Sequence, residues 1–168
     1  MDLSQLIMKH FWLVTILLIS AGFCAHAQTP STPPTGCSGK TGNPSITIKS
    51  GSPSFSFSSL SAFSTSQPSS ITLTITSAQP YTLYSAGVIT ALTGSSTNTV
   101  IPINTFSVSA NGATAVTLSN QYLPIATNVA KSVTTQVITI NLNAVGNMDT
   151  FQQAPGSHVL TLYFYLCN

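Results

Sequence analysis

The end of this chain decides its fold: residues 157–167, which follow a Pro-Gly pair, have the sequence SHVLTLYFYLC. Leu160, Leu162, Phe164 and Leu166 recur at every second position, and a period of two is that of a β-strand, whose side chains alternate between two faces. The positions between them carry threonine, tyrosine and cysteine. Because both faces can bury area, this stretch predicts an inner strand that closes a β-sandwich.

Alternation of the same kind recurs along the rest of the chain. The clearest example is residues 70–76, in which isoleucine and leucine alternate with hydroxyl residues that can face water. Residues 123–133 are the only stretch with apolar residues at helical spacing, and they are rich in threonine and asparagine, so no convincing helix is expected. The other stretches that we expect to be extended are residues 45–49, 55–57, 81–86, 100–108, 115–118 and 133–142.

Turn residues separate these stretches. Asn111-Gly112 is the strongest hairpin signal, and residues 64–69, which include Pro68, predict a loop. Short strands with turn signals every 8–12 residues or so are typical of a sandwich. The sequence therefore predicts an all-β fold, an immunoglobulin-like β-sandwich of about seven to ten antiparallel strands, over residues 45–168.

The composition of the chain excludes nucleic acid as a partner. Only 4% of the residues are charged, the formal net charge is +2, and the chain has no arginine and no glutamate. Lys40, Lys49 and Lys131 form no cluster, and arginine is needed for bidentate contacts with phosphate. Serine, threonine, asparagine and glutamine instead supply the solvated surface, as in many extracellular β-proteins.

The N-terminus has the pattern of a secretory signal peptide, which we expect to cover residues 1–27. Lys9 and His10 precede an apolar run at residues 11–19, and Ala25-His26-Ala27 fits the rule for the cleavage site. Cleavage between Ala27 and Gln28 is therefore expected, with export to the periplasm, the cell surface or the medium. Whether Met1 or Met8 starts the chain stays open.

Two alternatives to a cleaved signal remain. The first is an uncleaved membrane anchor, although the apolar run is shorter than the roughly 20 residues that a span needs, and we expect no transmembrane helix in the mature chain. The second is lipidation at Cys24, although Phe23 stands where the bacterial lipobox has a small residue.

Cleavage leaves two cysteines, Cys37 and Cys167, at opposite ends of the mature chain. An even number of cysteines in an exported protein predicts a disulfide, and two separate thiols are the alternative. The bridge would fasten residues 28–44, a Pro/Gly-rich N-terminal arm, to the closing strand. No further cysteine exists for a metal site.

Catalytic groups are scarce in the mature chain, which has one histidine and one aspartate. His158 opens the closing strand and is expected at the surface or the rim, and Asp149 is expected in a loop. A hydrolase that uses His158 is a distant alternative, but no G-x-S-x-G motif occurs. We predict a protein without catalytic activity, without a cofactor and without a metal.

Binding is a stronger alternative. Tyrosine rings can stack on a sugar or a peptide, so a carbohydrate- or peptide-binding module is the second reading of the chain. The alternative is that the tyrosines bind nothing and are half-buried, with their hydroxyls at the surface. The candidates are Tyr81, Tyr84, Tyr122, Tyr163 and Tyr165.

Four stretches, residues 55–57, 71–83, 100–103 and 154–164, together resemble a family of secreted bacterial β-sandwich domains. These are the WxL-type cell-surface domains, with spore-coat-U and pilin-like domains as relatives. The resemblance implies a structural or adhesive component of the cell envelope that contacts envelope glycan or another surface protein. His158 stands where the family has an aromatic residue and no Trp-x-Leu motif occurs, so peptidoglycan binding is not part of that expectation.

The arm at residues 28–44 contains no valine, isoleucine, leucine, phenylalanine or tyrosine. It therefore cannot act as the donor strand with which pilins complete a neighbouring subunit. Since residues 160–166 supply a closing strand from within, we predict a domain that folds alone, as a monomer or a weak oligomer.

Overall fold

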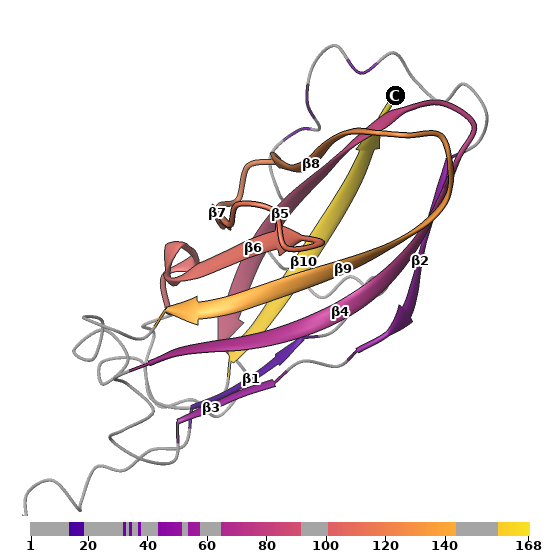
Figure 1. The fold of residues 1–168 in the computed structure, drawn as a ribbon. Helices are drawn as coiled ribbons and strands as arrows, with labels where there is room; N and C mark the ends of the chain where they lie inside the picture. Colours follow the sequence, from indigo (N-terminus) through magenta and orange to yellow (C-terminus); the bar gives the residue numbers. More distant parts are fainter. Residues whose placement is uncertain are drawn as a thin grey trace, which may run out of the picture.

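Two β-sheets face each other in the computed structural model of the chain (Figure 1). The structure describes residues 14–18, 32, 34, 37, 44–51, 54–57, 65–91, 101–143 and 158–168. The elements are β1 (Val14–Leu18), β2 (Ser45–Ser50), β3 (Ser54–Phe57), β4 (Ser66–Ser77), β5 (Tyr81–Ala91), η2 (a 3-10 turn, Ile103–Thr105), β6 (Phe106–Ala110), β7 (Val116–Thr117), β8 (Leu123–Val129), β9 (Ser132–Asn143) and β10 (His158–Cys167).

Each sheet has five strands. The first, which we call sheet A, has the order β3-β1-β10-β5-β8, and the second, sheet B, has the order β2-β4-β9-β6-β7. Long antiparallel pairs, β5 with β10 and β4 with β9, form the middle of the two sheets. The described residues thus confirm the predicted all-β sandwich, with ten strands.

The core lies between the sheets and is formed by the apolar side chains that alternate along the strands. Leu160 and Leu162 of β10 are buried, and Phe164 and Leu166 pack against the same cluster. Residues of β4 and β9 supply the opposing surface. A fully buried aliphatic or aromatic side chain contributes roughly 1.5–3 kcal/mol through removal of apolar area from water. The face predicted for the closing strand is therefore the face that the fold buries.

Pro68 corrects one expectation. Residues 64–69 were predicted as a loop, but β4 begins at Ser66, and Pro68 pairs with Asn141 of β9. Proline cannot donate to a strand ladder and is tolerated where a strand is an edge. The pairing of β2 with β4 ends at Thr72, so β4 has a described neighbour on one side only at Pro68, and the proline is accommodated there.

A second correction concerns residues 100–108, which were expected to be extended with a break at Pro102. Residues Ile103–Thr105 form the turn η2, and the strand β6 begins only at Phe106. The turn is closed at Thr105, whose backbone N–H and side-chain hydroxyl both donate to the carbonyl oxygen of Pro102, at 3.1 and 2.7 Å. Residues 123–129, in the one stretch with helical spacing, form the strand β8.

The hairpin predicted at Asn111-Gly112 is confirmed. Both residues have positive φ, 48° and 74°, as a two-residue turn between twisted strands requires. Ala113 N–H donates to the Ala110 carbonyl at 2.9 Å across the turn. The turn joins β6 to β7, which pair through Ser107–Thr117 and Val108–Val116.

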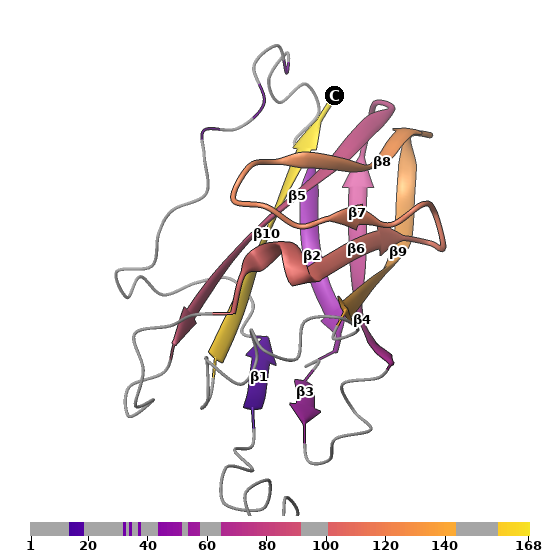
Figure 2. The same cartoon turned by 90° about the vertical axis from the view of Figure 1, so that its left-hand side faces the viewer.

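The strand β1 is the main difference from the predicted fold, because it comes from the apolar run expected to be a signal peptide. It lies at one end of sheet A between β3 and β10 (Figure 2). It runs antiparallel to β3 and parallel to β10, so the sandwich is not antiparallel throughout.

Candidate functional site

His158 is buried, with no exposed surface, which corrects the expectation that it lies at the surface or rim. It is the first residue of β10, and strands lie on both sides of it: Ala91 of β5 and Ile16 of β1 are its register partners. Its position has the same parity as Leu160 and Leu162, so its side chain belongs to the core face of the strand. A buried side chain between two strands cannot contact a substrate in this arrangement.

Several predicted features lie outside the described residues. These are the cleavage site at Ala27 and Gln28, the alternative lipidation site Cys24, and Asp149. In the described part of the chain, no group of three or more His, Cys, Asp or Glu side chains is placed to hold a metal ion. Among the same residues we find no helix with the length and apolar character that a membrane crossing requires.

The structure joins Cys37 to Cys167, as the sequence predicted. The two Cα atoms are 5.1 Å apart, within the usual span of a disulfide. Cys167 is the last residue of β10, and 130 positions separate the two cysteines in the sequence. The bridge therefore fastens the N-terminal arm to the far end of the closing strand.

Tyr81 does not belong to a binding surface. Its side chain is 2% exposed and packs in the core. Gln136 of β9 donates a hydrogen bond from Nε2 to the Tyr81 hydroxyl at 3.2 Å. This tyrosine is a structural link between the two sheets, so the set of candidate stacking residues is reduced by one.

The other four tyrosines gather on the outer face of sheet A, and we call them the tyrosine cluster: Tyr84, Tyr122, Tyr163 and Tyr165. Tyr163 and Tyr165 occupy the positions of β10 that alternate with the core residues. Tyr84 of β5 is the register partner of Tyr165 and therefore shares its face. All four side chains are half-buried.

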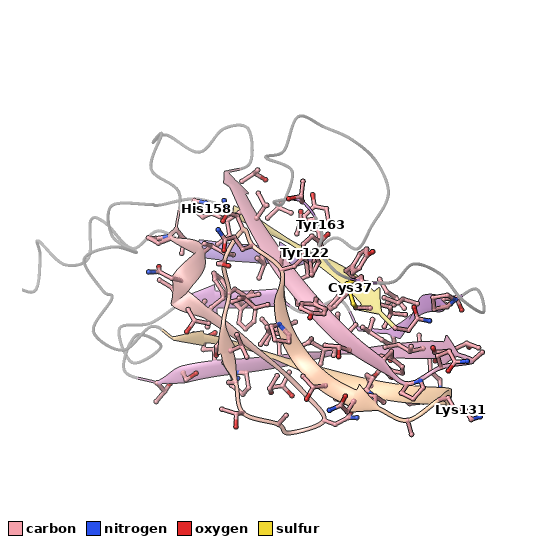
Figure 3. All side chains as sticks on the ribbon, turned by 90° about the horizontal axis from the view of Figure 1, so that it is seen from above. Cys37, Tyr122, Lys131, His158 and Tyr163 are labelled. Atoms are coloured by element: carbon pink, nitrogen blue, oxygen red, sulfur yellow. A yellow bond between two sulfur atoms is a disulfide. The ribbon has the colours of Figure 1, made fainter. Side chains whose placement is uncertain are left out.

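Tyr122 joins the cluster from the segment that leads into β8. Its ring meets that of Tyr165 edge to face, with centroids 5.9 Å apart and planes at 61°, which is a favourable geometry for two aromatic rings. Figure 3 shows Tyr122 near Tyr163 and well away from Lys131. The described residues carry only one other charged side chain, Lys49, which lies on β2 in the other sheet.

The crowding of these side chains changes the pKa of the Tyr122 phenol. Burial raises the pKa of Tyr122 above its ordinary value of 10.0, and the neighbouring Tyr163 and Tyr165 raise it further. Removing a proton from Tyr122 would place an anion in a partly dehydrated site beside two further phenols. The cluster is therefore a neutral surface of aromatic rings and hydroxyls, suited to stacking and hydrogen bonding with an uncharged ligand.

The second candidate site is a strand edge. β10 pairs with β1 through three residues, Ile16–His158, Leu17–Val159 and Leu18–Leu160. β3 pairs with β1 over four residues, and among the described residues β1 is the only strand between β3 and the rest of sheet A. Strand β10 is thus an inner strand of sheet A, as the sequence predicted, with β5 and β1 as its two neighbours.

Sequence reasoning missed β1 because its residues also fit the apolar core of a signal peptide. The sequence nonetheless contains a pattern typical of a strand. Val14, Thr15 and Ile16 are β-branched in succession, and β-branched residues favour extended backbone. An apolar run of this length satisfies both patterns. Only the pairing with β3 and β10 distinguishes them.

Fold and disulfide together define the class of this protein: an all-β sandwich domain whose closing strand is fastened to its N-terminal arm. The chain matches no known family model and no curated protein sequence. The function is therefore inferred from the two candidate sites.

Proposed function

We propose that the protein is an exported, non-catalytic structural or adhesive component of a bacterial cell envelope. The observation that carries the proposal is the disulfide between Cys37 and Cys167, because disulfides persist in oxidising compartments outside the cytosol. The apolar run and the A-x-A sequence at residues 25–27 support export. The resemblance to secreted bacterial surface domains supports the assignment to the envelope.

The position of His158 supports the non-catalytic part of the proposal. A general base must come within hydrogen-bond reach of the proton that it abstracts, and His158 has no exposed surface in the chain that retains β1. The hydrolase alternative requires this side chain to reach a substrate. It therefore receives no support from the geometry of β10.

Cell fractionation tests this proposal. The full chain is produced in a bacterial host with its own N-terminus, and the cytosolic, periplasmic, envelope and medium fractions are probed separately. We expect mature protein that begins at Gln28, contains an intact disulfide, and is retained by envelope extract in a pull-down. A cytosolic, reduced protein that keeps residues 11–19 would contradict export.

The tyrosine cluster supports a second function, the binding of a neutral carbohydrate. Four rings and their hydroxyls lie on one face without a charged described neighbour on that face, and sugars present both C–H faces and hydroxyls to such surfaces. Affinity electrophoresis through gels containing cell-wall or outer-membrane glycans tests it. Tyr163→Ala should weaken retardation at least fivefold, whereas Tyr81→Phe, in the core, should leave it unchanged.

A further inference from the structure

Asn111 continues the pairing of β6 with β9 by one further step, and it does so with its side chain. The register of the two strands ends at Ala110–Ile138, and Figure 2 shows β6 and β9 side by side. One residue further on, the Asn111 backbone N–H donates to the Val137 carbonyl oxygen at 2.8 Å. The Val137 N–H in turn donates to Asn111 Oδ1 at 2.7 Å. The side-chain oxygen thus takes the place of the backbone carbonyl that a hydrogen-bonded strand pair would supply.

The nitrogen of the same side-chain amide is also held by β9. Asn111 Nδ2 donates to Gln136 Oε1 at 2.7 Å, and Gln136 is 4% exposed. Asn111 and Gly112 are themselves exposed to solvent, at the turn of the hairpin. Water therefore reaches the turn, while hydrogen bonds from both polar atoms of the carboxamide fix its position.

An asparagine followed by glycine can react with its own backbone. The backbone nitrogen of the glycine attacks the side-chain Cγ, ammonia leaves, and water then opens the resulting succinimide ring to aspartate or isoaspartate. Glycine has no Cβ that would obstruct the attack, and Asn111-Gly112 is the only Asn-Gly pair in the chain. Asn128, which also has a positive φ of 52°, is followed by the β-branched Val129. The sequence therefore favours this reaction at Asn111.

We propose that Asn111 is a self-modification site, at which asparagine converts to aspartate and isoaspartate, and that its hydrogen bonds to β9 set the rate. For the Gly112 nitrogen to reach Cγ, the carboxamide must turn away from Val137 and Gln136. Both side-chain hydrogen bonds must therefore open before the ring forms. The reaction consumes one water and releases one ammonia, and no group is oxidised or reduced. This inference is independent of the proposed export and of glycan binding.

The product cannot restore the hydrogen bonds that the reaction breaks. A carboxylate has no N–H, so an acceptor would face the acceptor Oε1 of Gln136. Gln136 can donate to the carboxylate only by turning its own amide round, which takes Nε2 away from the Tyr81 hydroxyl, 3.2 Å from it. In isoaspartate the main chain also runs through Cβ, so the two-residue turn loses its geometry. Modification of Asn111 therefore detaches the hairpin from β9 and from the core, and it is not reversed.

Three proteins and one peptide test this inference. Gln136→Leu removes the acceptor of Asn111 Nδ2. Gly51→Ala is the matched control, because its Cβ would lie 2.8 Å from Ile71 Cα and destabilise the fold away from the hairpin, leaving the Asn111 hydrogen bonds in place. The reference is the peptide VSANGATA, residues 108–115. All are incubated with the parent in the same mildly alkaline buffer below their Tm, and peptide mapping and an ammonia assay follow deamidation.

The parent should deamidate at Asn111 at least about tenfold more slowly than the peptide, the factor that opening two hydrogen bonds of ordinary net strength implies. Gln136→Leu should recover most of that difference, whereas Gly51→Ala should stay close to the parent. Hydrogen exchange of the Val137 amide should rise in step with deamidation. Asn111→Asp, which places one product in the chain, should lower the Tm and also speed exchange at Val137.

A parent that deamidates at Asn111 as fast as the peptide would overturn the inference, and this comparison needs no variant to fold. Equal acceleration in Gln136→Leu and Gly51→Ala would overturn it too, because the reaction would then follow unfolding of the whole domain. Faster modification at another asparagine of the folded parent would refute the choice of site. An Asn111→Asp protein as stable as the parent would refute the detachment of the hairpin.

Discussion

Gln136 and Tyr81 connect the two sheets through the core: the Gln136 Nε2 donates to the Tyr81 hydroxyl at 3.2 Å. The Gln136 side chain also accepts a hydrogen bond at Oε1 from Asn111 Nδ2, at 2.7 Å. Asn111 in turn accepts at Oδ1 from the backbone N–H of Val137, at 2.7 Å. The hairpin turn, β9 and β5 are therefore linked by one chain of hydrogen bonds, whose middle residue is 4% exposed.

Replacing Gln136 with leucine should destabilise the protein by roughly 1–3 kcal/mol, because the buried Tyr81 hydroxyl and the Asn111 amide each lose a partner. The measurement is urea denaturation, in which the midpoint should fall at an unchanged slope. Val137→Thr is the matched control, since Val137 is 42% exposed on the same strand, and it should stay within about 0.5 kcal/mol of the parent. Equal stability of the leucine variant would show that the network contributes nothing net.

Loss of the disulfide should lower stability more than any single surface substitution. A loop of 130 residues gives roughly 5 kcal/mol in the chain-entropy model, and measured values usually lie at 2–5 kcal/mol. The Cys37→Ser/Cys167→Ser double variant should therefore melt at least several degrees lower in oxidising buffer, and reduction of the parent should reproduce the shift. An unchanged Tm would contradict the contribution assigned to the bridge.

Gly51 and Gly112 form a pair for testing backbone strain. Both have positive φ, 112° and 74°. A Cβ at Gly51 would lie 2.8 Å from Ile71 Cα and from the Ser70 carbonyl oxygen, whereas a Cβ at Gly112 has no atom within 4 Å. Gly112→Ala should cost about 1 kcal/mol from its φ alone, and Gly51→Ala about 2–3 kcal/mol or more. Thermal melts that rank the two variants equally would be inconsistent with the clash.

Tyr122 should make the protein less stable in alkali. Its pKa in the folded protein is raised above 10.0 by burial and by Tyr163 and Tyr165, so the folded state holds the phenolic proton more tightly than the unfolded state. Its contribution is complete below pH 10 and is lost as the pH rises through the folded pKa. Tyr122→Phe should reduce the loss of stability that sets in as the pH rises above 10. Absorbance titration at alkaline pH, compared with the parent, should show one late-ionising phenol fewer.

In the chain that retains β1, His158→Ala should destabilise the fold by roughly 1–3 kcal/mol, because it leaves a cavity at a site that strands cover on both sides. The sequence alone predicted a tolerant surface or rim position. Chemical denaturation of parent and variant tests the difference, and esterase and glycosidase assays run alongside it. Unaltered stability would argue against burial in the solution structure, and an activity that depends on His158 would contradict the non-catalytic proposal.

The sequence by itself determined the class of fold and most of its strands. The reason is that apolar alternation in β10 or in residues 70–76 has one low-energy solution, a strand with a buried face. It also determined the hairpin at Asn111-Gly112, whose φ angles few other residues adopt. The pairing of Cys37 with Cys167 followed from there being two cysteines in the mature chain.

Tertiary structure decided the features that depend on contacts between segments far apart in the sequence. The sequence predicted a loop at Pro68, but the shortness of β2 leaves an edge on which proline is harmless. Sequence alone did not distinguish core tyrosines from surface tyrosines, but the register of β5 on β10 buries Tyr81 and places Tyr84 beside Tyr165. The run at residues 14–18 fits both a signal peptide and a strand, and only the edges of β3 and β10 make it a strand. Strand pairing joins residues that are distant in sequence, so these features are decided only once the sheets have formed.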